Sequence, residues 1–233
     1  MRNAIAITGA PGSGKTTLAA QLALAMQHTG QGVLVVFCDG HLPPKSYLQP
    51  TSDSKEIVSL GQLLTATQLS ELFLWDAMCP AGENLAAIGY GANETSERYP
   101  CITYTGAARL LDMLEKFEGT VVFDCTDALT DVLSQAALKR AEAVVVTLTA
   151  DAKSAAWHKM QRLPQRTITV LNKVTRGQAI ECFDVAFQLC HVNALAEQFE
   201  TQCLWEQAKD KAFCKKIQQL ATQLQTAVSW RDM

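Results

Sequence analysis

The chain has 233 residues, of which 48% are apolar and 18% are charged, and its formal charge is −3. The length suits one or two domains, the apolar content excludes a disordered chain, and the acidic balance argues against a broadly basic nucleic-acid-binding surface. No apolar run approaches the ~18 residues of a membrane-spanning helix. The N-terminus leads at once into a phosphate-loop pattern, which leaves no room for a signal peptide and predicts a cytoplasmic protein.

Short apolar runs alternate with helical stretches along the chain, which predicts a doubly wound α/β fold with a mostly parallel sheet and helices on both faces. The predicted strands are Ala4–Thr8, Val33–Cys38, Val121–Cys125, Ala143–Leu148 and Thr167–Leu171, with weaker candidates at Leu85–Tyr90 and Val185–Leu189. The predicted helices are Lys15–His28, Gly106–Phe117, Asp131–Arg140, Ala152–Arg162 and Lys209–Ala227.

One segment interrupts this regular alternation. Residues 40–100 combine a Pro-Pro turn, a polar stretch and apolar helical stretches. We interpret them as a long excursion off the sheet within a single phosphate-loop NTPase domain over residues 1–233. Long excursions between strands often carry function.

The eight cysteines show no close pairing. None is spaced C-x-x-C or C-x-C from another, so a zinc or redox site has little support. Several lie inside apolar runs, which favours free, buried thiols in a reducing compartment.

The strongest motif matches G-x-x-x-x-G-K-[ST] between a predicted strand and a predicted helix. Its glycines let the backbone N–H groups turn toward phosphate oxygens, and the following helix presents its positive end to them. Lys15 would reach the β- and γ-phosphates, and Thr16 would ligate Mg²⁺. The residues predicted to surround the nucleotide phosphates are Gly9, Ala10, Pro11, Gly12, Ser13, Gly14, Lys15, Thr16 and Thr17.

Two predicted strands end in an aspartate. Asp124 follows an apolar strand, at the position where phosphate-loop enzymes hold Mg²⁺. Asp39 ends the strand after the first helix and could orient the water that attacks the γ-phosphate, besides helping to hold the metal. Asp127 and Asp131 are candidates for a switch region or for loop and helix caps.

These ordered motifs resemble those of the MinD/ParA group of phosphate-loop ATPases over nearly the whole chain. The resemblance implies ATP and Mg²⁺ as ligands, a homodimer that depends on nucleotide, and an unidentified protein partner. Asp39 matches the family's aspartate linked to hydrolysis, and Asp124 matches its metal-site strand. The segment around Asn172 and Lys173 is similar to the adenine-side strand, where the asparagine contacts the base.

The sequence departs from the family at two points. The family loop carries a second, signature lysine, whereas this region reads Gly9-Ala10-Pro11-Gly12 and contains none. Phe37 replaces the first aspartate of the family's Asp-x-Asp pair. Both departures imply slow hydrolysis. A loop that lacks the lysine also resembles that of the atypical TadZ/CpaE branch.

Membrane and nucleic-acid signals are weak. The stripe from Phe213 to Leu224 is typical of a helix face packed on a core rather than on a membrane. A basic cluster predicts a solvated helix face more readily than a DNA-binding patch. Its members are His158, Lys159, Arg162 and Arg166.

Three functions are compatible with these residues. The first is a weakly hydrolysing Mg-ATP-dependent switch in the localisation, partition or assembly of a cellular machine, with Lys15 and Asp39 as its catalytic residues. The second is a small-molecule or nucleoside kinase, whose loop the sequence Ala-Pro-Gly-Ser-Gly-Lys also fits. The third is an ATP-binding scaffold without hydrolysis. No segment carries a readable code for the partner.

Overall fold

The computed structural model describes residues 1–39, 58–91, 94, 98–99, 102–127, 130–164, 166–175, 183–200 and 204–229. Eight strands form one sheet in the order β3-β4-β2-β5-β1-β6-β7-β8. Neighbouring strands run parallel throughout, except that β3 pairs antiparallel with β4. The strands are β1 (Ala4–Gly9), β2 (Gly32–Phe37), β3 (Cys79–Gly82), β4 (Leu85–Ile88), β5 (Gly119–Asp124), β6 (Ala143–Leu148), β7 (Thr167–Val174) and β8 (Phe187–Cys190).

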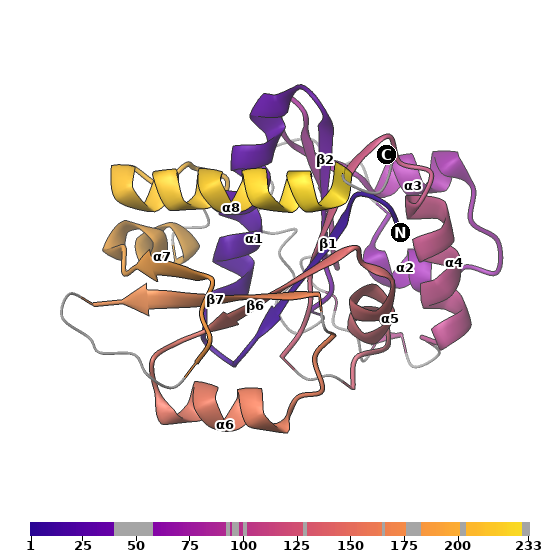
Figure 1. Cartoon of the computed structure of the whole chain (residues 1–233). Coiled ribbons are helices and arrows are strands. Elements are labelled where there is room, and N and C mark those ends of the chain that lie inside the picture. Colours follow the sequence, from indigo (N-terminus) through magenta and orange to yellow (C-terminus); the bar gives the residue numbers. More distant parts are fainter. Residues whose placement is uncertain are drawn as a thin grey trace.

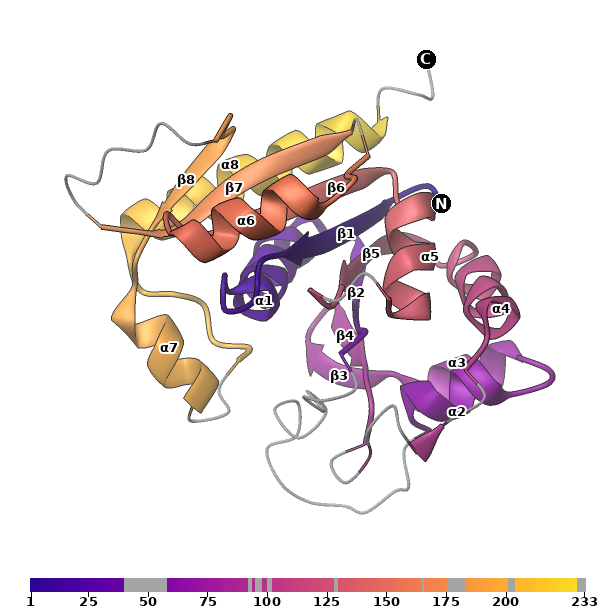
Figure 2. The same cartoon turned by 90° about the horizontal axis from the view of Figure 1, so that it is seen from below.

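Helices cover both faces of this sheet (Figures 1 and 2). On one face α1 and α8 pack against each other. The buried residues of α2, α3, α4, α5 and α6 join the core on the other face. The helices are α1 (Lys15–Met26), the 3₁₀ turn η1 (Gln27–Thr29), α2 (Leu60–Thr65), α3 (Glu71–Ala77), α4 (Tyr104–Leu114), α5 (Val132–Arg140), α6 (Ala152–Met160), α7 (Asn193–Glu200) and α8 (Lys211–Ser229).

Polar side chains mark where many of these helices begin. Each accepts a hydrogen bond from a backbone N–H of the first turn, which would otherwise have no partner. Asp131 and Asp151 therefore serve as caps of α5 and α6. The capping residues are Ser59, Ser70, Thr103, Asp131 and Asp151.

The predicted α/β architecture is confirmed, including both weaker strand candidates, which correspond to β4 and β8. The interpretation of residues 40–100 as an excursion off the sheet is wrong for one part. Residues 79–88 form β3 and β4 at the sheet edge, where β4 pairs with β2. The physical reason is that Leu85, Ala87 and Ile88 supply a short buried strand that can extend the sheet. Residues 40–57, with the Pro-Pro turn, lie outside the described residues.

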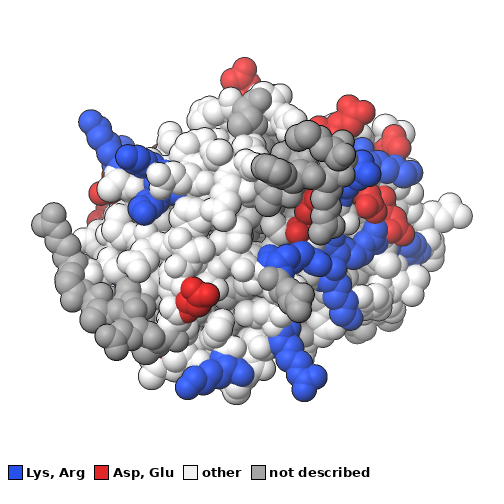
Figure 3. Space-filling model, viewed as in Figure 1, with Lys and Arg blue, Asp and Glu red and all other residues white. Residues whose placement is uncertain are grey.

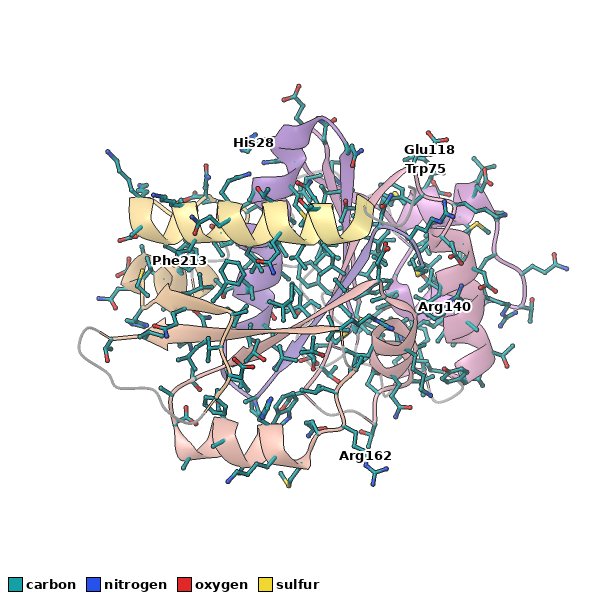
Figure 4. All side chains as sticks on the ribbon, in the orientation of Figure 1. His28, Trp75, Glu118, Arg140, Arg162 and Phe213 are labelled. Atoms are coloured by element: carbon teal, nitrogen blue, oxygen red, sulfur yellow. The ribbon has the colours of Figure 1, made fainter. Side chains whose placement is uncertain are left out.

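The C-terminal helix packs on the core as the sequence predicts. Phe213, Ile217, Leu220 and Leu224 are all buried, and Phe213 lies where α8 passes over the strands (Figure 4). Among the described residues no helix is long and apolar enough to cross a bilayer. This stripe is therefore accounted for by internal packing.

The cysteines within the described residues form no disulfides. Cys38, Cys79 and Cys125 are buried, Cys214 is half-buried and Cys190 is exposed. Cys101, Cys182 and Cys203 lie outside the described residues.

The predicted basic cluster is divided among structural contacts. Arg166 donates to the carbonyls of Leu138 and Lys139 at the C-terminus of α5, where a cation is favourable. His158 stacks edge-on against Phe183, whereas Arg162 projects outward (Figure 4). On the face seen in Figure 3, basic and acidic side chains lie side by side at the right-hand edge. At that edge the charges therefore do not form a patch of one sign.

Candidate functional site

The phosphate loop connects β1 to α1, as the motif predicts. Gly12 and Gly14 have left-handed φ values of 74° and 86°, a region that glycine occupies without cost. Gly9 is required for another reason. A Cβ there would lie 2.1 Å from the carbonyl oxygen of Thr147, so only glycine lets the loop approach β6 this closely.

Thr147 on β6 supports the loop from below. Its Oγ1 lies 2.9 Å from Ser13 Oγ and donates to the Thr8 carbonyl at 3.1 Å. Its own carbonyl accepts from the backbone N–H of Ala10 at 3.2 Å. The sequence reasoning missed Thr147, since the loop motif contains no information about the neighbouring strand. A signal was available in its place near the end of a predicted strand, where polar side chains of a parallel sheet meet the ligand loops.

Two residues at the end of β7 hold the loop from the side. Asn172 Nδ2 donates to the Ser13 carbonyl at 2.9 Å, and Lys173 Nζ donates to the Gly12 carbonyl at 2.8 Å. Asn172 Oδ1 accepts from the backbone N–H of Lys173. Both residues lie at the predicted site, but each contacts the loop itself. The predicted contact between Asn172 and a base stays a prediction.

Lys15 and Thr16 are the first two residues of α1 and lie where the phosphate loop ends. Lys15 Nζ lies 3.3 Å from the carbonyls of both Gly9 and Ala10, so the ammonium is held inside the loop. Thr16 Oγ1 donates to Asp124 Oδ2 at 2.7 Å. The loop hydroxyl and the strand-end carboxylate, 108 residues apart, thus meet directly.

Asp124 is a buried carboxylate whose charged form is disfavoured by its surroundings. It is 2% exposed, and burial raises its pKa to about 7, against the opposing effects of the Thr16 hydrogen bond and the Lys15 charge. The carboxylate of Asp39 raises it further. Its second oxygen, Oδ1, is buried with no hydrogen-bond partner among the described residues. A buried carboxylate oxygen without a partner is costly, which makes it the natural position for a cation.

The other predicted acids separate into two roles. Asp39 lines the cavity beside the loop, and so does Asp127. Asp131 caps α5 through the Ser134 N–H at 2.6 Å, and burial raises its pKa. The structure therefore assigns Asp131 to helix capping and leaves Asp39 and Asp127 beside the ligand cavity.

A cavity of about 460 Å³ opens over the loop, within the range of small-molecule sites. Part of the loop forms its floor, namely Pro11, Gly12, Gly14, Lys15, Thr16 and Thr17. Gly9, Ala10 and Ser13 are buried and do not line the cavity. Its far wall is largely apolar, and the sequence reasoning did not identify it. That wall consists of Leu189, Val192, Leu195, Ala196 and Phe213, with Cys190 and His191 beside them.

The polar groups present fit Mg²⁺ held together with phosphates. No group of three or more His, Cys, Asp or Glu side chains among the described residues is arranged to hold a metal alone. Mg²⁺ does not need such a group, because it is usually held by one or two carboxylates, substrate phosphates and water. Thr16, Asp124 and Asp39 supply hard oxygen atoms at the loop, and the unpartnered Asp124 Oδ1 is the best placed of them.

Sequence comparisons give a limited match. A family model described as Novel STAND NTPase 3 matches residues 1–74, which contain the loop, α1 and β2. No curated protein matches the chain. Sequence alone therefore relates the N-terminal third of the chain to an NTPase family.

Solved structures match over nearly the whole chain. A ParA family ATPase from Chlorobium tepidum is 17% identical, with a TM-score of 0.75 over 95% of this chain and 98% of that one. The septum site-determining protein MinD from Pyrococcus horikoshii, complexed with Mg-ADP, is 18% identical, with a TM-score of 0.74 over 99% and 100%. Cobyrinic acid a,c-diamide synthase from Mycobacterium smegmatis, with bound ATP analogue and magnesium, is 14% identical, with a TM-score of 0.66 over 99% and 97%. The chain thus has the phosphate-loop NTPase fold of the MinD and ParA structures.

Proposed function

We propose that the protein binds Mg-ATP, hydrolyses it slowly and acts as a nucleotide-dependent switch. The observation that carries the proposal is the unpartnered Asp124 Oδ1 beside Thr16, at the base of a preformed phosphate loop. Such an oxygen has no hydrogen-bond partner among the described residues, and it would complete a site for a cation that accompanies phosphates. The nucleotide complexes of structures with the same fold support this proposal.

Each residue has a separate task in this site. The loop N–H groups and Lys15 bind the β- and γ-phosphates, and Lys15 stabilises the charge that develops during transfer. Thr16 and Asp124, with Asp39, would hold Mg²⁺, which neutralises phosphate charge when bound. Asp39 orients a water for attack on the γ-phosphate. The apolar wall from Leu189 to Phe213 receives the base and excludes water from it.

The output of the switch is proposed to be self-association and partner binding. Asp39 and Asp127 lie on loops that follow β2 and β5 and both face the cavity. Bound nucleotide would reposition these loops and so alter a homodimer or a contact with another protein. A role in localisation, partition or assembly fits this output, and a TadZ/CpaE-like role rests on the lysine-free loop alone.

The experiment is the solution mass of the Asp39→Ala variant by light scattering, with and without Mg-ATP. We expect ATP binding to persist, turnover to slow by about 100-fold, and the mass to double with Mg-ATP. Asp76→Ala, which removes an exposed carboxylate on α3, is the matched control. Absence of ATP binding in the wild type would refute the proposal, and binding without any change of mass would refute the switch.

A scaffold that binds ATP without turnover is the second candidate, and the absence of a lysine in Gly9-Ala10-Pro11-Gly12 favours it. Turnover at the background rate together with tight binding would select it. A kinase would instead transfer phosphate to an added nucleoside or small-molecule acceptor.

A further inference from the structure

The end of β7 has an unusual backbone conformation. Lys173 has a φ of 58°, a left-handed conformation that suits glycine and asparagine rather than lysine. Asn172 Oδ1 accepts from its backbone N–H at 2.9 Å and so stabilises the turn. A residue kept in an unfavourable conformation is a reason to ask what its side chain does there.

The Lys173 side chain crosses the phosphate loop. Its Cε lies 3.8 Å from the position that a Cβ on Gly14 would occupy, and its Nζ reaches the Gly12 carbonyl at 2.8 Å. Asn172 Nδ2 fixes the next carbonyl, that of Ser13, at 2.9 Å. Two consecutive loop carbonyls are thus held from the same strand end.

Holding these carbonyls also fixes the N–H groups of the loop. In a planar trans peptide the C=O and the following N–H point in opposite directions. The bond to the Ser13 carbonyl therefore turns the Gly14 N–H away from β7. The bond to the Gly12 carbonyl fixes the turn that the Ser13 N–H closes onto the Ala10 carbonyl at 3.1 Å. The loop is thereby held in shape without any nucleotide.

We propose that Lys173 is a positioning residue for phosphate binding, which acts on the loop and not on the base. Together with Asn172 it keeps the loop, before nucleotide arrives, in the shape that phosphate binding requires: Asn172 orients the Gly14 N–H, and Lys173 fixes the turn at Gly12. The proposal rests on the function proposed above, that the loop binds nucleotide phosphates. Lys15 and Lys173 are the lysines among the described residues that line the cavity; Lys15 lies inside the loop and Lys173 braces it from outside.

Lys173 could act on the phosphate loop or on the base of the nucleotide. A ligand that has phosphates but no base distinguishes these two actions. We would measure binding of Mg-ATP and of magnesium tripolyphosphate to the wild type and to Lys173→Met, which keeps the stem and removes the ammonium. We expect both ligands to bind about tenfold more weakly to the variant, because a charge-assisted hydrogen bond to the loop is lost. Lys159→Met, an exposed change on α6, should alter neither. Weakened ATP binding with unchanged tripolyphosphate binding would overturn the proposal, and so would no change in either.

Further readouts distinguish positioning from general stability. Lys173→Arg should restore tripolyphosphate affinity to within about threefold, since it keeps a charged donor. In turnover assays Lys173→Met should raise KM about tenfold while kcat stays within about twofold. A fall in kcat at unchanged KM would contradict a positioning role.

Hydrogen exchange tests the brace without nucleotide. In the free protein, Lys173→Met should speed exchange of the amides in residues 12–14 about tenfold and leave α4 unchanged. Unchanged exchange in the loop would overturn the proposal whether or not the protein binds ATP. If the wild type bound neither ATP nor tripolyphosphate, the proposed function would fail, whereas faster loop exchange would still establish the brace itself.

Discussion

The phosphate loop and the carboxylate beside it differ in how completely their polar groups are satisfied. Thr147, Asn172 and Lys173 together provide partners for the Ala10 N–H, the Ser13 hydroxyl and the carbonyls of Gly12 and Ser13. Asp124 is more deeply buried than Lys173, yet one of its oxygens has no partner among the described residues. The fold satisfies these polar groups of the loop, whereas the carboxylate keeps one oxygen without a hydrogen-bond partner.

This difference shows where the protein accepts an energetic cost. A loop that binds phosphate through backbone N–H groups must be rigid before the ligand arrives. A carboxylate that binds a cation must instead keep an oxygen available, although burial makes its charged form unfavourable. Under the proposed function, a preorganised loop and a carboxylate oxygen without a hydrogen-bond partner are two complementary ways of preparing for Mg-ATP.

The largest effect should come from Lys15→Ala. The ammonium is the cation inside the loop, so its loss should weaken ATP binding about 100-fold or more. Titration with a fluorescent ATP analogue measures this. Lys116→Ala, which removes an exposed lysine after α4, should leave affinity unchanged. Retained affinity in Lys15→Ala would show that the preformed backbone alone suffices.

Asp124→Asn should show separately how much stability the buried carboxylate costs and how much it contributes to Mg²⁺ binding. The amide keeps an acceptor for the Thr16 hydroxyl but cannot ionise, so at pH 8 the free protein should gain about 2 kcal/mol of stability. Mg²⁺ should no longer strengthen ATP binding. Urea unfolding measures the stability of the free protein, and calorimetry with and without Mg²⁺ measures the effect of the metal on ATP binding. A variant that is less stable than the wild type at pH 8 would mean that Asp124 is already satisfied.

The same carboxylate should make stability and binding depend on pH. Its pKa is about 7 in the folded protein and near 3.8 without the fold, so the folded state binds the proton more tightly. Stability from this group is therefore full below about pH 4 and falls as the pH rises to about 7. Mg-ATP binding at pH 7 should release about half a proton from Asp124. Calorimetry in buffers of different ionisation enthalpy measures the number of protons released. The same measurement on Asp124→Asn gives the protons released by ATP itself, which are subtracted.

Thr147→Val should give the smallest effect. It tests the phosphate loop, whose polar groups have partners within the fold. The change keeps the shape and removes the hydroxyl between Ser13 and the Thr8 carbonyl. We expect a loss of about 1 to 2 kcal/mol in the free energy of unfolding and a roughly threefold to fivefold weaker affinity for ATP, because the hydroxyl takes part in two neutral hydrogen bonds. Thr222→Val, at an exposed hydroxyl of α8, is the control and should change stability by less than about 0.5 kcal/mol.

Local patterns in the sequence were sufficient for much of the fold and part of the site. The loop, its flanking strand and helix, and the strand ending in Asp124 were all predicted, because each depends on residues adjacent in the chain. From the sequence, Asp131 could be a helix cap or a switch residue. Only the hydrogen bond that it accepts from the Ser134 N–H identifies it as a cap. The edge strand β3 was not predicted and its neighbour β4 was one of the weaker candidates, since four-residue strands carry little periodicity.

By itself, the sequence determined that this chain has a phosphate loop at the carboxyl end of a parallel sheet, since spacing and apolar periodicity are local properties. Only the tertiary structure decided what surrounds that loop. β5 enters the sheet between β1 and β2 and so places Asp124 against Thr16. Thr147 and Lys173 reach the loop from strands more than 130 residues away, and β8, α7 and α8 assemble the apolar wall. These contacts depend on strand order and register, which no local pattern encodes.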